Sequence, residues 1–226
     1  MTEFRTTDAA RRQFIIGVSA ATGAAAIAQS PLAWGRGGVA KALLPYTPKV
    51  LTHTEVSTLK AVMARLIPAD AHGGGAVEAM AYIYVDRELA STYAGQLPVY
   101  RQGLAALLTL TKKNGAASIA ALSAKDLDAL LGRLESGAVT EAIQDDAQQN
   151  LSFTDGGKQF FAPLRQHTVE GTFSDPMYGG NQHFIGWRIV NYPGVQYVYS
   201  KAALAVNGKF KVVNHSIAEF GGKPLS

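Results

Sequence analysis

The chain has 226 residues, of which 47% are hydrophobic and 17% are charged, and its formal net charge is +4 at pH 7. This composition supplies enough apolar surface for one buried core, and its scattered basic residues argue against a nucleic-acid partner. The chain has no cysteine, which excludes disulfide bridges, thiolate nucleophiles, Cys-ligated zinc or iron–sulfur clusters and covalently attached haem c.

The N-terminal segment has the pattern of a twin-arginine export signal. Arg11 and Arg12 are followed by Phe14 and by a weakly apolar stretch rich in Ala and Gly. This pattern predicts a signal peptide over residues 1–28 and a periplasmic protein. Gly38-Val39-Ala40 is a second candidate for the cleavage site, which would extend the signal to residue 40.

A retained membrane anchor is the alternative interpretation of this segment. Its apolar run is shorter than the roughly 20 residues that span a bilayer, which favours a cleaved signal. We therefore expect membrane association only through partners, at the outer face of the inner membrane within a complex. A linker and extended segment is expected over residues 29–50, and a helical domain over residues 51–226.

The first two predicted helices follow a capping signal and an apolar stripe. Thr52 and Glu55 form a capping box, and the apolar spacing that follows continues to Pro68. After a glycine-rich loop, a second stripe at helical spacing runs from Val77 to Val85.

Three further helices are expected downstream. One has Pro98 in its first turn and ends near Asn114, and the next begins at the capping residue Ser123. The last begins near Thr154 or Asp155 and ends near Ser174. The only strand-like alternation is at residues 194–199. The predicted fold is therefore all-α, with a single domain of about five or six helices and a long irregular, aromatic-rich C-terminal segment.

That C-terminal segment is rich in turn formers and aromatic residues. Gly179-Gly180-Asn181 tolerates positive φ, and Pro176 and Pro193 prevent a helix from continuing. Its aromatic side chains offer far more contact area than a soluble loop needs. Candidate residues for an interface with a partner are Phe173, Asp175, Pro176, Tyr178, Asn181, Trp187 and Arg188. Tyr178 and Trp187 are also candidates for the core, and the adjacent Arg188 favours the interface.

The Ser-Asp-Pro-x-Tyr-Gly-Gly-Asn string at residues 174–181 and the Gly-Trp-Arg at 186–188 resemble the hallmark of the gluconate 2-dehydrogenase subunit 3 family. The resemblance extends upstream to Leu51-Thr52. It implies a non-catalytic small subunit of a heteromeric sugar or polyol dehydrogenase. The FAD would lie in a large flavoprotein partner of the glucose–methanol–choline type, and haem c often lies in a third, cytochrome c subunit.

The residues agree with a chain that holds no flavin or haem of its own. No Gly-x-Gly-x-x-Gly string follows a strand pattern, and no Cys-x-x-Cys-His is present. Because the twin-arginine route carries folded cargo, one hypothesis is that this chain exports a flavoprotein that lacks a signal.

A stand-alone metal-binding enzyme is the second alternative. His167 and Glu170 lie one helical turn apart, and Asp175 and His183 follow closely in sequence. A di-metal helical bundle needs ligands from several facing helices, which the earlier helices offer sparsely. A Ser-His-Asp hydrolase lacks the Gly-x-Ser-x-Gly elbow. We therefore expect no catalytic, cofactor-binding or metal-binding residue in this chain.

Overall fold

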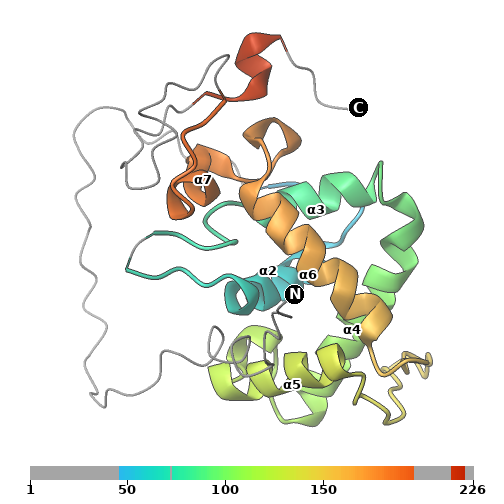
Figure 1. Cartoon of the computed structure of the whole chain (residues 1–226). Helices are drawn as coiled ribbons and strands as arrows, with labels where there is room; N and C mark the ends of the chain where they lie inside the picture. Colours follow the sequence, from blue (N-terminus) through green and yellow to red (C-terminus); the bar gives the residue numbers. More distant parts are fainter. Residues whose placement is uncertain (1–45, 72, 196–214, 222–226) are drawn as a thin grey trace, which may run out of the picture. The chain divides into compact units, whose positions relative to one another are not determined.

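The structure is a computed structural model and describes residues 46–71, 73–195 and 215–221. The predicted export signal, most of the linker and residues 196–199 of the strand-like stretch lie outside the described residues. The helices, numbered as in Figure 1, are α2 (His53–Leu66), α3 (Ala81–Leu89), α4 (Leu97–Lys113), α5 (Ala124–Ser136), α6 (Lys158–Phe173) and α7 (Ile185–Ile189). Short 3₁₀ turns are η1 (Ala94–Gln96), η2 (Ile119–Ala121), η3 (Pro176–Tyr178), η4 (Gln182–Phe184) and η5 (Ile217–Phe220).

The predicted all-α class is confirmed. The described part contains no β-strand, and extended pairing there is confined to two isolated bridges. None of its helices combines the length and the apolar character that crossing a bilayer requires.

Capping residues and a first-turn proline fix the ends of α2, α4 and α5 close to the predicted positions. Thr52 caps α2 in a complete capping box with Glu55, and the Ser123 side chain accepts the Asp126 N–H at the start of α5. Helix α4 has a proline in its first turn and ends at Lys113, with Asn114 as its C-cap. These interactions satisfy backbone groups that a helix end leaves without a partner.

Helix α6 begins and ends close to the predicted positions. The N-cap is Gly157 rather than Thr154 or Asp155, but the Asp155 carboxylate accepts the N–H groups of Gly157 and Gln159. The helix ends at Phe173, with Ser174 as its C-cap, before Pro176.

Helix α3 begins later than the apolar stripe suggests. Residues 76–80 form turns, and Met80 adopts a left-handed conformation with φ of 56°. Val77 and Met80 are nevertheless half-buried against the core. The turn therefore presents apolar side chains to the same interior as α3 does, so the stripe continues although the helix does not.

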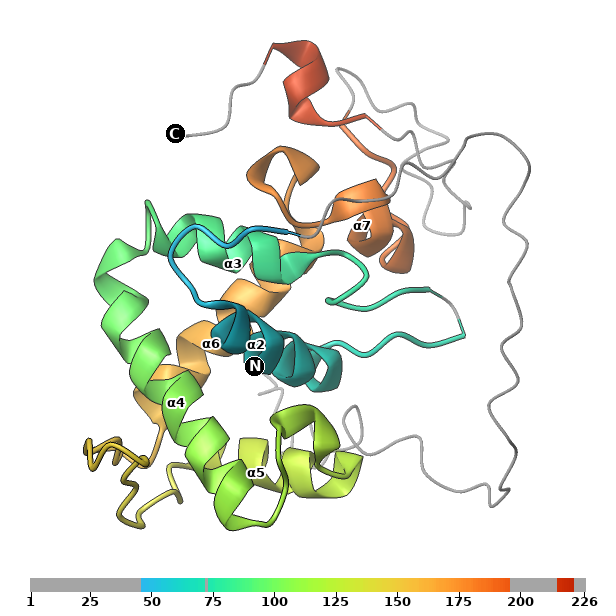
Figure 2. The ribbon, with the colours of Figure 1, turned by 180° about the vertical axis from the view of Figure 1, so that it is seen from behind.

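Helix α6 crosses the bundle and organises the core. It packs against α3, α4, α5 and α7, and Figures 1 and 2 show it with α2 from opposite sides. Close approach to α4 depends on Gly103, where an added Cβ would lie 2.2 Å from the Phe160 ring. Gly171 has the same role against α3, because a Cβ there would lie 2.8 Å from the Ala81 carbonyl oxygen. The segment after α6 is thereby held next to α3.

Candidate docking site

The predicted interface residues, apart from Phe173 at the end of α6, lie in one continuous excursion that folds back on the C-terminal half of α6. It consists of η3, η4 and α7, joined by residues in left-handed conformations. Four of the six non-glycine residues with positive φ in the described part belong to it: Asn181, His183, Phe184 and Asn191. Such conformations are unfavourable for L-residues and persist only where the surrounding contacts hold them.

Asn181 is the main anchor of this excursion. Its side chain is fully buried, accepts the Gly186 N–H at 2.8 Å and donates to the Ser174 carbonyl at 2.7 Å. Its backbone N–H donates to the Gly171 carbonyl at 2.8 Å. One side chain therefore joins the end of α6 to the start of α7, which explains why an amide is needed here.

Trp187 is a second residue that anchors α7 to the end of α6. Its indole N–H donates to the Phe173 carbonyl oxygen at 2.8 Å, and 5% of the residue is exposed. Its ring packs against Phe184 and, edge to face, against Tyr192, with ring centroids 5.3 Å and 4.9 Å away. Phe173 itself is half-buried. The burial of Trp187 supports internal packing, and its role at a partner interface stays a prediction.

Asp175 connects the excursion to the C-terminal turn. Its carboxylate accepts the Met177 N–H at the start of η3, the Ser216 hydroxyl at 2.5 Å and the Ile217 N–H at 2.8 Å. Charge-assisted bonds of this kind are stronger than neutral ones. The carboxylate therefore holds η5 in place, and its partners are all within the chain.

The other predicted interface residues differ in exposure. Pro176 and Tyr178 are half-buried, and Tyr178 packs against the hydrophobic core. Arg188 is exposed, and its guanidinium donates to the His183 carbonyl at 2.5 Å. It is followed by Ile189 and Val190, which are 40% and 56% exposed. Of the predicted set, Arg188 is therefore the residue that faces solvent most openly.

The candidate metal residues are separated by their internal partners. His167 is 1% exposed, shares a 2.9 Å hydrogen bond with Tyr100 and stacks on Tyr93 with ring centroids 4.1 Å apart. Glu170 accepts the hydroxyl groups of Tyr84 and Tyr93 at 2.9 Å and 3.1 Å. No group of three His, Cys, Asp or Glu residues with the geometry for a metal ion occurs in residues 46–71, 73–195 and 215–221.

The surroundings of His167 and Glu170 also shift the pKa values of His167 and Tyr84. Burial lowers the pKa of His167 below its ordinary value of 6.5, while the Glu170 carboxylate acts in the opposite direction. Burial, followed by the hydrogen bond to Glu170, raises the pKa of Tyr84. Neutral His167 and neutral tyrosines around one carboxylate form a stable hydrogen-bonded cluster.

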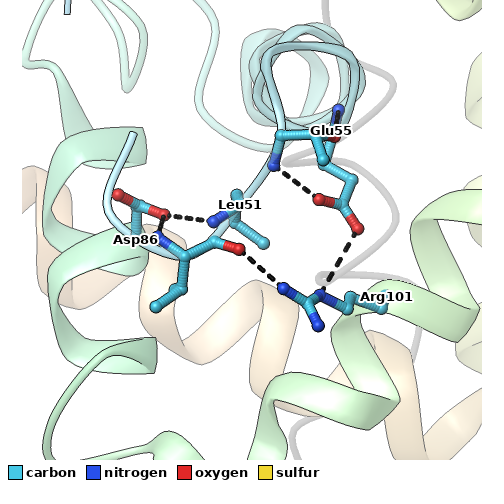
Figure 3. A network of polar contacts seen from close by, with 6 residues as sticks. Leu51, Glu55, Asp86 and Arg101 are labelled. Carbon is cyan, nitrogen blue, oxygen red and sulfur yellow. Dashed lines mark hydrogen bonds and ion pairs between the residues drawn. The ribbon is translucent and has the colours of Figure 1, made fainter. Parts of the chain in front are cut away.

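A second anchor, Asp86, is one that the sequence analysis missed. Its fully buried carboxylate on α3 accepts the Tyr46 hydroxyl at 2.6 Å and the N–H groups of Lys49, Val50 and Leu51 at 2.5, 3.1 and 2.8 Å. Figure 3 shows the Asp86 carboxylate bonded to the Leu51 N–H, and Arg101 between this segment and Glu55. Arg101 on α4 donates to the Val50 carbonyl at 2.9 Å and lies 3.9 Å from the Glu55 carboxylate. Residues 46–51, which we call the strap, are therefore fixed to α3 and α4.

A signal for this anchor is present in the sequence. Asp86 lies on the apolar face of α3, with Tyr82 and Leu89 one turn away on either side and both buried. A carboxylate within an apolar helical stripe must be buried with hydrogen-bond donors, since burial without them is costly. The sequence does not indicate which donors those are.

Comparison with known proteins gives one family match. The model of the family described as gluconate 2-dehydrogenase subunit 3 matches residues 53–194, which include α2 to α7 and end just after Tyr192 and Pro193. No curated protein and no solved structure matches the chain.

Proposed function

Because this chain belongs to the gluconate 2-dehydrogenase subunit 3 family, we propose that it is the non-catalytic small subunit of a periplasmic, FAD-dependent sugar or polyol dehydrogenase. The family match over residues 53–194 is the observation that carries the proposal. A member of a family described as subunit 3 of a dehydrogenase works together with other subunits. We assign the redox groups to those partner subunits. The large partner would be a flavoprotein of the glucose–methanol–choline type, and a cytochrome c subunit would accept its electrons where one is present.

The internal bonding of the C-terminal excursion supports a binding role over a catalytic one. Asn181, Asp175 and Trp187 have their polar groups occupied by partners within the chain. Such groups position a backbone, whereas a general acid or a nucleophile must be free to meet a substrate. The excursion therefore has the character of a rigid scaffold that presents a surface.

We further propose that the chain supports export of the flavoprotein. Arg11, Arg12 and Phe14 carry the twin-arginine pattern, and this route transports folded cargo. The strap is bonded to Asp86 on the helical body. A signal attached ahead of the strap would thus be carried by a folded subunit, and a flavoprotein bound to that subunit would be exported with it.

The export proposal is tested by replacing both Arg11 and Arg12 with Lys and measuring sugar-dependent dye reduction in periplasmic and cytoplasmic fractions. We expect the activity to remain in the cytoplasm. Arg5→Lys is the matched control, because Arg5 lies outside the arginine pair, and it should leave the periplasmic activity unchanged. Unchanged export in the double variant would remove the export role and leave the binding role to be tested by itself.

The binding proposal is tested with the full chain carrying a C-terminal tag. We expect a flavin-containing protein that oxidises a sugar or polyol to co-purify with it in a fixed ratio. Sugar oxidation by the isolated chain, or a purified flavoprotein that shows no affinity for the chain, would contradict the proposal.

A further inference from the structure

Two adjacent large apolar residues that are both exposed, at the end of α7, distinguish this region from the rest of the described surface. Ile189 and Val190 are 40% and 56% exposed, and Arg188 precedes them. We call these three residues, with the neighbouring Gly73, the α7 surface. Single exposed apolar residues are common on soluble proteins. Here two large ones adjoin each other and an arginine, a combination that is enriched in protein interfaces.

The backbone beneath the α7 surface is held in a costly conformation. His183 and Phe184 both have φ of 57°, immediately before α7, and Asn191 has φ of 52° immediately after Val190. Left-handed conformations of non-glycine residues cost roughly 1 kcal/mol or more each. The bonds from Asn181 to Gly186 and from Trp187 to Phe173 hold the segment despite that cost. The surface is consequently preorganised, which lowers the entropy lost when a partner binds.

A glycine-rich hairpin lies beside α7 and leaves Ile189 partly exposed. Asp70 and Gly73 pair through backbone bonds of 3.0 and 3.3 Å, and Figures 1 and 2 both show this loop next to α7. A Cβ added to Gly73 would lie 3.5 Å from Ile189, and one added to Gly74 would lie 3.3 Å from Ile185. Gly73 therefore brings only backbone next to Ile189, which is 40% exposed.

The charge on the α7 surface indicates what kind of partner fits. The Arg188 guanidinium bonds the His183 carbonyl, and no carboxylate of the described part forms an ion pair with it. A guanidinium has five N–H donors, so donors remain for a carboxylate of a partner. In a symmetric contact between two copies, each copy would contribute Arg188, while the carboxylate that adjoins this surface, that of Asp70, already accepts the Gly73 N–H at 3.1 Å. Charge therefore favours a different protein over a second copy.

We infer that the α7 surface is where the flavoprotein subunit docks, with Ile189 and Val190 entering an apolar depression and Arg188 meeting a carboxylate at its edge. This inference rests on the proposed function and assigns a location to the contact. It also explains why the polar groups of Asn181 and Asp175 form bonds within the chain. These bonds shape the surface, and the three residues after Trp187 make the contact.

The test measures retention of purified flavoprotein by the full-length tagged chain, read from flavin absorbance at graded flavoprotein concentrations. Arg188→Glu and Val190→Asp should each weaken retention roughly tenfold or more, as loss of a central interface residue does. Lys125→Glu on α5 and Val169→Asp on α6 are the matched controls, since Lys125 is exposed and Val169 is 46% exposed. Both controls should retain the flavoprotein as the wild type does.

The possible outcomes separate the two proposals. If the wild-type chain retains no flavoprotein, the proposed function fails. If the wild type and both α7-surface variants retain it equally, the docking inference fails and the proposed function stands. Thermal unfolding of each variant shows whether a loss of flavoprotein retention reflects unfolding. The inference is supported if a variant loses retention but is as stable as the wild type. If sedimentation shows a wild-type dimer that Val190→Asp separates, a second copy occupies the surface and the inference is overturned.

Discussion

The hydroxyl of Tyr46 donates to the carboxylate of Asp86 across forty residues of sequence, at 2.6 Å. The same carboxylate takes three consecutive backbone N–H groups of the strap. A single buried side chain thus decides where the N-terminal segment joins the helical body. The consequences for stability can be measured.

Asp86→Ala should lower the free energy of unfolding by at least about 2 kcal/mol, because it leaves buried N–H donors of the strap without an acceptor. Tyr46→Phe removes one donor and should cost about 1 kcal/mol. Urea unfolding followed by circular dichroism measures both. Asp146→Ala is the matched control, since that carboxylate is 89% exposed in its pair with Lys112, and a surface pair contributes roughly 0–1 kcal/mol. Equal losses for Asp86→Ala and Asp146→Ala would refute the anchoring role.

Stability should also depend on pH through His167. Burial lowers the pKa of this imidazole in the folded state, so the folded chain favours the neutral form. As the pH falls below 6.5, the ordinary value, His167 of the unfolded chain takes up a proton before the folded chain does. The free energy of unfolding should therefore decrease from pH 6.5 down to the lowered pKa, and be fully present above pH 6.5.

The groups that face His167 are Tyr93, Tyr100 and Glu170. His167→Gln removes the imidazole and should flatten this part of the pH profile, although it also lowers stability by disturbing the stack. The wild-type chain, measured over the same pH range, is the reference. A slope that is the same with and without His167 would show that another group is responsible.

The close approach between α6 and α7 predicts an intolerance at Gly186. A Cβ on this residue would lie 1.8 Å from the Thr172 carbonyl oxygen. Gly186→Ala should therefore lower the free energy of unfolding by about 1–3 kcal/mol through overpacking. Gly132 in α5 has open space around its Cβ position, and Gly132→Ala should raise stability by about 0.5–1 kcal/mol because alanine favours a helix. Thermal unfolding of the two variants should move in opposite directions, and a neutral Gly186→Ala would mean that α7 separates easily from α6.

Local signals explain most of what the sequence predicts correctly. The capping residues Thr52 and Ser123 act within one helical turn, so their effect is visible in the sequence alone. Ser174 ends α6 because a proline follows two residues later. These interactions need no information about the rest of the fold.

Contacts between distant segments explain what the sequence leaves open. The four donors to Asp86 come from residues 46–51, and their arrival depends on how the strap crosses α3. The left-handed backbone at His183 and Phe184 is likewise set by packing, because neither residue type requires it. Met80 ends the turn before α3 in the same conformation, which delays the helix beyond its apolar stripe. In each case tertiary contacts outweigh local preference.

Trp187 allows the internal and the external roles of the excursion to be separated. Trp187→Phe keeps most of the ring packing but loses the bond to the Phe173 carbonyl, and should lower the free energy of unfolding by about 1 kcal/mol. Trp187→Ala also removes a buried aromatic side chain, at about 3–5 kcal/mol. Because α7 depends on this indole, Trp187→Ala should weaken flavoprotein retention together with stability, whereas Val190→Asp, at a residue that is 56% exposed, should weaken retention alone. A stable Trp187→Ala chain that loses retention would instead place the indole itself in the interface.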